Sequence, residues 1–208
     1  MRRMDIRRHL QYFWWCYMAI LVFAIIFWTY VYGIIRTPDA NEKLTLSCFG
    51  KDFDGAGLDL EIEEKLSNIT SQNIKELSVD HVKQTDNIVF GSMIQTRLYS
   101  SDIMIFEEEV ITEEFAAMNF RPFTAELEAC FADTHIEYYV IDGIKCGIII
   151  NPQGEKTNVF TKYYSRDSRL IAFFAPHSEN LGGAYGIGNK EDDAGVALMK
   201  FLLEEIDG

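Results

Sequence analysis

Residues 43–69, KLTLSCFGKDFDGAGLDLEIEEKLSNI, carry the pattern that decides the fold. Apolar residues alternate from Lys43 to Phe49, which predicts a strand. Asp54 to Gly57 then interrupts the chain, and apolar residues follow at helical spacing. These helical positions are Leu58, Ile62, Leu66 and Ile69. A strand followed directly by a helix is the building unit of α/β domains.

The next segment repeats this order. Lys75 to Val82 predicts a second strand, Asp86 is placed to cap a helix, and Ile103 to Phe106 predicts a third strand after Ser101 and Asp102. The helix in between has its apolar residues on one face, at Val89, Phe90, Met93, Ile94 and Leu98. Such alternation predicts a parallel sheet with right-handed crossovers.

Beyond residue 107 the pattern is less regular. It predicts short helices near Glu113 to Met118 and up to Phe131, and strands at Tyr138 to Ile141, Cys146 to Ile150 and Leu170 to Phe174. A Gly-rich segment then precedes a final amphipathic helix, for which Asn189 is the expected cap. Its apolar positions are Ala194, Ala197, Leu198, Phe201, Leu202 and Ile206. We therefore predict one three-layer α/β domain over residues 43–208.

An apolar segment precedes this domain. Tyr12 to Ile35 contains no charged residue, and a helix of that length reaches ~36 Å, enough to cross a bilayer. Arginines stand before it at positions 2, 3, 7 and 8, so the positive-inside rule predicts a cytoplasmic N-terminus and an extracytoplasmic domain. We therefore divide the chain into a cytoplasmic basic tail (1–9), a transmembrane anchor (10–36), a linker (37–42) and the outer domain (43–208), with lipid around residues 12–35.

A cleaved secretory signal is the alternative for this segment, because basic residues also precede its apolar core. However, the stretch is longer than a usual signal core, and no small-residue cleavage site follows it. Aromatic residues lie toward both ends, as in the interfacial belt of a permanent span. They are Trp14, Trp15, Trp28, Tyr30 and Tyr32. We therefore predict an uncleaved, single-pass anchor in the cell membrane.

The predicted outer domain is strongly acidic. Five of the 19 basic residues but only one of the 32 acidic residues lie before residue 37, which leaves 14 basic and 31 acidic residues after it. Such a surface repels nucleic acid and anionic lipid, and would favour cationic partners. The alternative is that the acidic surface has no partner and only keeps the domain soluble.

The cysteines lack the spacing of a metal site. Cys48 and Cys146 lie in apolar surroundings and are expected to be buried, whereas a disulfide between Cys130 and Cys146 stays open. Gly50 to Glu61 partly matches a calcium-binding loop, but its first position lacks an acidic ligand and a strand precedes it. The simpler interpretation of this segment is a turn between a strand and a helix.

No catalytic centre is evident either. His177 and Ser178 are adjacent, but a triad requires partners that the fold brings together. Glu107, Glu108 and Glu109 could supply paired carboxylates, although a solvated strand end explains them as well. We predict a non-catalytic protein without a metal or cofactor.

Several motifs follow one another along the domain: SDIMI at 101–105, NFRPF at 119–123, YYVIDGIKCGI at 138–148 and GIGNKEDDA at 186–194. In this order they resemble the extracellular solute-binding proteins of bacterial ABC importers, which have the type II periplasmic-binding fold. Full-length members insert a second lobe between the hairpin and the last helix, whereas this chain has about forty residues there. The resemblance is therefore to a single lobe.

Solute-binding proteins trap a ligand by closing two lobes over it, so one lobe offers an open shelf. The resemblance thus favours an interaction module that presents its sheet edge or rim loops to a partner outside the membrane. An envelope protein or the membrane protein of an ABC transporter would suit this role. The alternative is weak or dimer-assisted binding of a small solute, and the oligomeric state stays open.

Ends of strands at which helices begin are where α/β folds place their sites. We therefore nominate a rim made of the residues after the first strand, after the third strand and in the late loop. They are Phe49, Lys51, Asp52, Glu107, His177, Ser178 and Asn180.

Overall fold

Two units make up the chain, Met1–Pro38 and Asp39–Gly208. The computed structural model describes residues 6–36, 38–39, 42–50, 53–69, 74–83, 87–151, 158–164, 169–178, 180–181 and 193–204.

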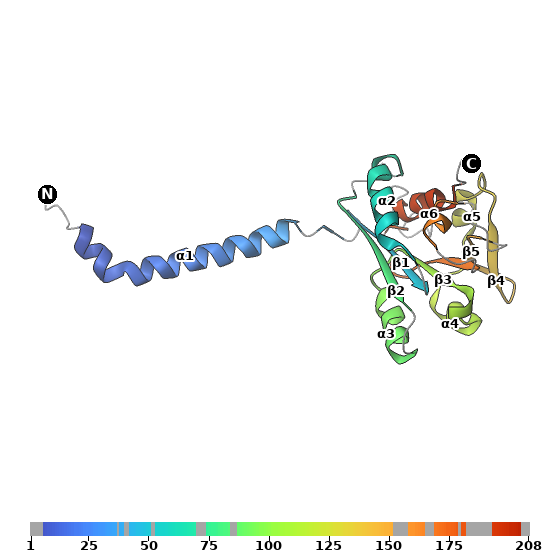
Figure 1. Ribbon diagram of the computed structural model, residues 1–208, viewed down its shortest axis with the longest axis horizontal. Coiled ribbons are helices and arrows are strands. Elements are labelled where there is room, and N and C mark those ends of the chain that lie inside the picture. Colours follow the sequence, from blue (N-terminus) through green and yellow to red (C-terminus); the bar gives the residue numbers. More distant parts are fainter. Residues whose placement is uncertain are drawn as a thin grey trace. The chain divides into compact units, whose positions relative to one another are not determined.

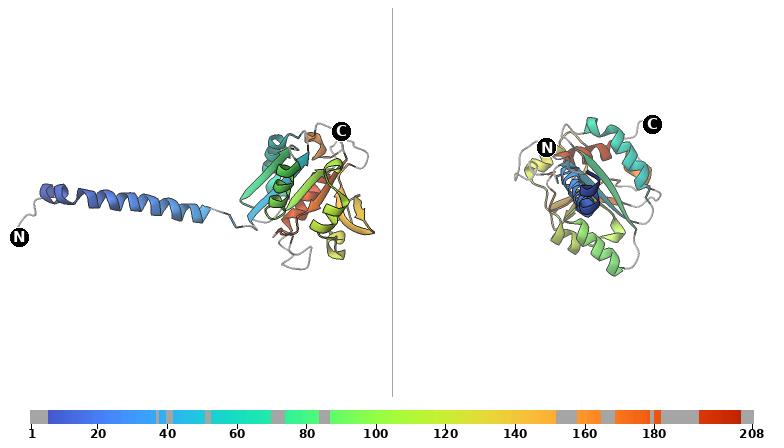
Figure 2. Two further views of the ribbon diagram at one scale, coloured as in Figure 1. Left: turned by 90° about the horizontal axis from the view of Figure 1, so that it is seen from below. Right: turned by 90° about the vertical axis from the view of Figure 1, so that its left-hand side faces the viewer.

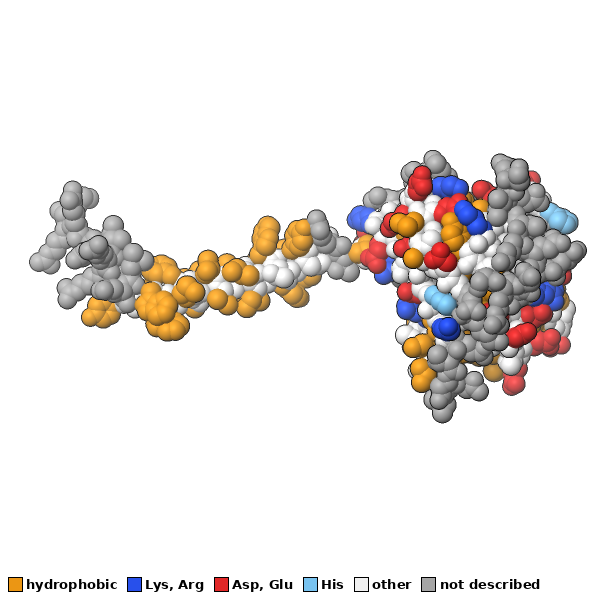
Figure 3. Space-filling model, in the orientation of Figure 1, with side chains coloured by type: hydrophobic (Ala, Val, Ile, Leu, Met, Phe, Trp, Pro, Cys, Tyr) orange, Lys and Arg blue, Asp and Glu red, His pale blue; other side chains and the backbone are white. Residues whose placement is uncertain are grey.

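The first unit is one long helix, α1 (Ile6–Arg36). Its segment Tyr12–Ile35 is long and apolar enough to cross a membrane. Figure 3 shows hydrophobic side chains along this helix. The expected N-terminal apolar helix is therefore confirmed, whereas its orientation in a membrane stays a prediction.

In the second unit, the described residues form a six-stranded sheet in the order β2-β1-β3-β6-β5-β4. The strands are β1 (Lys43–Gly50), β2 (Glu76–Lys83), β3 (Ile103–Glu107), β4 (Glu137–Ile141), β5 (Ile144–Ile149) and β6 (Leu170–Phe174). The first three are parallel, as the alternation predicts. The other three run antiparallel to their neighbours, so the sheet is mixed.

Helices cover both faces of this sheet (Figures 1 and 2). Core residues of α2 (Gly55–Ile69), α5 (Ala125–Cys130) and α6 (Ala194–Leu203) pack on one face. Core residues of α3 (Asn87–Arg97) and α4 (Glu113–Asn119) pack on the other. Two short 3-10 helices, Glu108–Val110 and Thr161–Tyr163, follow β3 and precede β6. Each strand–helix unit read from the sequence is therefore present.

Local sequence accounts for several element ends. Thr112 and Thr124 accept hydrogen bonds from the backbone N–H groups of Phe115 and Leu127, and so cap α4 and α5. The β4–β5 hairpin turns at Asp142 and Gly143, whose φ angles are 49° and 80°, as a two-residue turn requires. The caps expected at positions 86 and 189 lie outside the described residues, and α6 begins after Asp193.

The four cysteines, all within the described residues, form no disulfide. Cys48 and Cys146 are buried, as their apolar neighbours predict. Burial raises the pKa of the Cys48 thiol well above its ordinary value, so this thiol stays protonated and behaves as a small apolar group. The structure therefore gives these two cysteines a packing role.

Candidate binding groove at the edge of the sheet

The crevice at which a parallel sheet places its ligands is filled here by the protein itself. It lies at the carboxyl ends of β1 and β3, because the chain leaves β1 toward β2 on one side and leaves β3 toward β4 on the other. Glu107 is buried there and accepts a hydrogen bond from the hydroxyl of Tyr164. At Gly50, a Cβ would lie 2.8 Å from Glu107 Oε1 and would also collide with the Tyr164 hydroxyl. Tyr164 and Glu107 thus occupy the space that a ligand would need.

Phe49, nominated as a rim residue, is a core residue. Its ring stacks on that of Phe106 at 4.5 Å and is 1 % exposed. Its alternation along β1 points it into the core cluster with Phe90. Lys51 and Asp52, nominated beside it, lie outside the described residues.

The late loop lies at the opposite end of the sheet from Glu107. Because β6 is antiparallel to β3, Phe174 pairs with Ile103 at the amino end of β3. The fold therefore separates Glu107 from His177, Ser178 and Asn180, because β6 runs antiparallel to β3.

At this amino end, Asp102 is the centre of a buried hydrogen-bond network. Its Oδ1 accepts from Ser178 Oγ at 2.6 Å and from Asn180 Nδ2 at 2.9 Å. Its Oδ2 accepts from the backbone N–H of Thr45 at 2.7 Å. Asn180 Nδ2 also donates to the carbonyl of Lys43 at 2.8 Å. The network joins β1, β3 and the segment after β6, which is a structural task.

Within the described part of the chain, His177 makes no hydrogen bond to this network. Its ring stacks on Tyr99 at 4.5 Å, while Ser178 donates its proton to Asp102. A nucleophilic serine needs a base that accepts its proton and is poised to pass it on, and a histidine normally fills that role. This arrangement is therefore not a catalytic triad.

The segment with partial calcium-loop spacing has other partners. Asp54 Oδ1 accepts from the backbone N–H of Gly57 at 3.1 Å, at the start of α2. Glu61 accepts from Lys65 and Lys162 at 3.0 Å each and from the Tyr163 hydroxyl. These contacts, the Tyr163 bond foremost, lower the pKa of Glu61 to about 2. Among the described residues no group of three or more acidic, His or Cys side chains is arranged to hold a metal.

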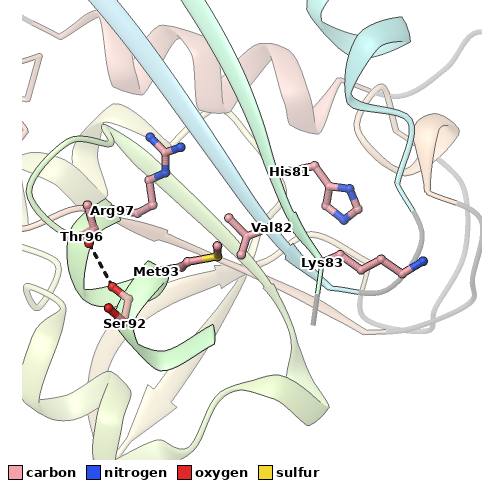
Figure 4. A pocket seen from close by; sticks show the side chains of 7 residues that line it. All are labelled: His81, Val82, Lys83, Ser92, Met93, Thr96 and Arg97. Carbon is pink, nitrogen blue, oxygen red and sulfur yellow. Dashed lines mark hydrogen bonds between the residues drawn. The ribbon is translucent and has the colours of Figure 1, made fainter. Parts of the chain in front are cut away.

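An open groove of about 560 Å³ lies between β2 and α3. Its walls are His81, Val82 and Lys83 from β2 and Ser92, Met93, Thr96 and Arg97 from α3. Figure 4 shows Met93 reaching from the helix toward Val82 of the strand, with Arg97 farther along. The volume lies in the range of ligand pockets, which is ~300–1,000 Å³.

This groove runs along an edge of the sheet that is open within the described part of the chain. β2 ends the strand order, and all eight of its residues keep an unbroken register with β1. It contains no proline. The opposite edge, β4, is shorter and is interrupted by a register shift between Tyr139 and Val140. Bulges and short strands prevent the pairing of edges, so β2 is the edge suited to accept another strand.

The charges along β2 are unevenly balanced. Its two carboxylates are paired: Asp80 with Arg97 at 2.8 Å and Glu76 with Lys43 at 2.5 Å. Lys83 is exposed and has no ion pair within the described part of the chain. Lys83 thus adds to the groove a positive charge that no described carboxylate pairs with, on a protein of net charge −13.

Sequence reasoning missed this groove because it assigned Val89 and Met93 to the buried face of a helix. They are 48 % and 45 % exposed, whereas Phe90, Ile94 and Leu98 fill the core. Spacing could not separate the exposed pair from the buried three, because five apolar residues in ten positions is an ordinary density for one helix face.

Comparison of the chain with models of protein families, with characterised proteins and with solved structures finds no match.

Proposed function

We propose that this protein is a non-catalytic interaction module, tethered to the membrane by α1, which recognises a partner outside the membrane through the groove between β2 and α3. The observation that carries the proposal is the open, uninterrupted edge of β2 beside exposed apolar side chains of α3. Exposed backbone groups of an edge strand bind other chains unless they are blocked. Apolar side chains left in water beside them also favour contact with a partner.

The filled crevice at Gly50 supports the same proposal. Tyr164 and Glu107 close the place where this architecture holds small ligands. The half-buried Ser178 and the buried Asp102 at the other end are used in a structural network. These four residues therefore have packing or pairing roles.

Site-specific photocrosslinking of the full chain in cells tests this proposal. A photoreactive residue at Met93 should yield a discrete crosslinked species whose other member is one reproducible protein. Met118 is the matched control, because it is also an exposed methionine on a helix, on α4. Equal crosslinking at both positions, or none at position 93, would contradict the proposal.

The placement of the domain outside the membrane is tested separately. It rests on the arginines before Tyr12 and on the positive-inside rule. Protease added to intact cells that lack an outer barrier should digest the domain and leave the N-terminal tail protected. Protection of the domain until the membrane is opened would place it in the cytoplasm.

Small-solute binding is the second candidate, favoured by the volume of the groove. A solute bound only to the folded state would raise the unfolding temperature. A panel of sugars, amino acids and short peptides at millimolar concentration should then give at least one shift, and Met93→Trp should abolish it by filling the groove. A flat panel would remove this candidate.

A further inference from the structure

We infer that the occupant of the groove is an extended segment of a partner protein, with acidic and aliphatic side chains in alternation, which adds to the sheet as a strand beside β2. This inference rests on the proposed function and specifies the mode of recognition. Strand addition takes its affinity from backbone hydrogen bonds and its specificity from pockets for alternate side chains. Both parts are available at this edge.

The backbone part comes from the geometry of β2. Its register with β1 is continuous from Glu76 to Lys83, so no bulge interrupts the strand between its ends. Eight paired residues exceed the usual strand length of ~5–6 residues. Half of the backbone groups of an edge strand point outward and need a partner.

The side chains that would contact the added strand differ between its two faces. On the α3 face, Val82 and the exposed Met93 form an apolar surface, and Ser92 and Thr96 border it. An aliphatic side chain of the partner would be buried there. On the other face, His81 packs against Phe53, and Lys83 projects from the end of the strand.

The ion pairs along β2 indicate which charge the partner segment should carry. Asp80 and Glu76 are neutralised by Arg97 and Lys43, whereas Lys83 is not neutralised by any described carboxylate. A partner carboxylate beside Lys83 would complete an ion pair, and opposite charges on neighbouring strands stabilise pairing. A partner lysine there would face a like charge.

Peptide binding to the full chain in nanodiscs of neutral phosphatidylcholine tests the inference. The probes are two eight-residue peptides, one alternating valine with glutamate and one alternating valine with lysine. We expect the glutamate peptide to bind at least tenfold more tightly. Lys83→Glu should reverse this preference, and Met93→Glu should weaken binding at least tenfold. Met118→Glu, on the exposed methionine of α4, should leave binding unchanged.

Amide hydrogen exchange separates strand addition from side-chain docking alone. With the glutamate peptide bound, exchange in residues 76–83 should slow at least tenfold at alternate positions, since only outward amides gain a partner. Binding without this protection would overturn strand addition and leave the interaction module of the previous section intact. Failure of the glutamate peptide to bind, or equal affinity for both peptides, would also overturn it. A dimer of the chain that Met93→Glu dissociates would assign the groove to a second copy and overturn it too.

Discussion

Individual buried polar residues hold the strand ends of this sheet together. At one end Tyr164 donates to Glu107 above Gly50, and at the other Asp102 accepts three hydrogen bonds. A buried carboxylate that loses its donors is costly, because it retains a desolvated charge. The residue types are those of a functional site, but the hydrogen bonds that these residues make show that they stabilise the fold.

Gly50→Ala should destabilise the domain by about 1–3 kcal/mol, because a methyl group there displaces Tyr164 or Glu107. Gly91→Ala is the matched control, since a Cβ at that position of α3 meets nothing within 4 Å. It should stabilise the helix by about 0.5–1 kcal/mol. Urea unfolding followed by circular dichroism is the suitable measurement, because all three tryptophans lie in α1. Equal effects of the two substitutions would argue against the packing at Gly50.

Glu61 makes stability depend on pH. Its pKa is lowered from 4.5 to about 2 by the bonds from Tyr163, Lys162 and Lys65. A depressed folded-state pKa contributes stability that is complete above the unfolded value and is lost as the pH falls toward 2. Glu61→Gln should therefore lower the urea midpoint at pH 7, and the difference from the unsubstituted protein should shrink between about pH 4.5 and 2. Exposed Glu64→Gln serves as control; a difference that persists unchanged at pH 2 would contradict this role for the charge.

At the scale of elements, the two halves of the sheet are made differently. The parallel half comes from strand–helix units, whereas the antiparallel half is a meander of β4, β5 and β6 joined to β3. The meander begins with a tight turn in which Asp142 and Gly143 have positive φ. Such a turn sets the register of its hairpin.

Gly143→Ala should destabilise the hairpin by about 1 kcal/mol, because the backbone at φ 80° disfavours a Cβ although no neighbour obstructs it. The loss should appear as a lower urea midpoint and as faster amide exchange in β4 and β5. Asp142→Asn should cost less, since asparagine tolerates the left-handed conformation well. An alanine variant as stable as the original protein would show that a side chain at position 143 causes no backbone strain in the turn.

At the scale of the whole molecule, the two units are separable. The domain unit begins at Asp39, and its first residues are attached to it: Lys75 donates its backbone N–H to the carbonyl of Glu42 at 2.7 Å and pairs with its carboxylate at 2.6 Å. The contacts that stabilise the sheet lie within this unit.

A chain of residues 39–208 should therefore fold without α1 and remain soluble without detergent. Its urea midpoint should match that of the full chain, within error. A chain that begins at Lys43 lacks the Glu42–Lys75 contacts and should have a slightly lower urea midpoint, because a partly exposed ion pair contributes little to stability. Aggregation of residues 39–208, or loss of its circular dichroism signal, would show that α1 contributes to folding.

Much of the architecture could be predicted from sequence because it depends on local periodicity. The apolar helix, the first three strands, the helices between them and the Asp142–Gly143 hairpin follow from spacing and turn chemistry within short segments. The burial of Cys48 and Cys146 follows from their apolar neighbours in the same way.

The candidate site could not be predicted, because it depends on which strands become neighbours. The apolar N-terminal helix and the α/β domain follow from local spacing, since they depend on contacts between residues close in the chain. Tertiary contacts make β6 run antiparallel to β3, which separates Glu107 from Ser178, and leave β2 at an edge beside Met93. Strand order and direction arise from contacts between residues far apart in sequence, and no local pattern records them.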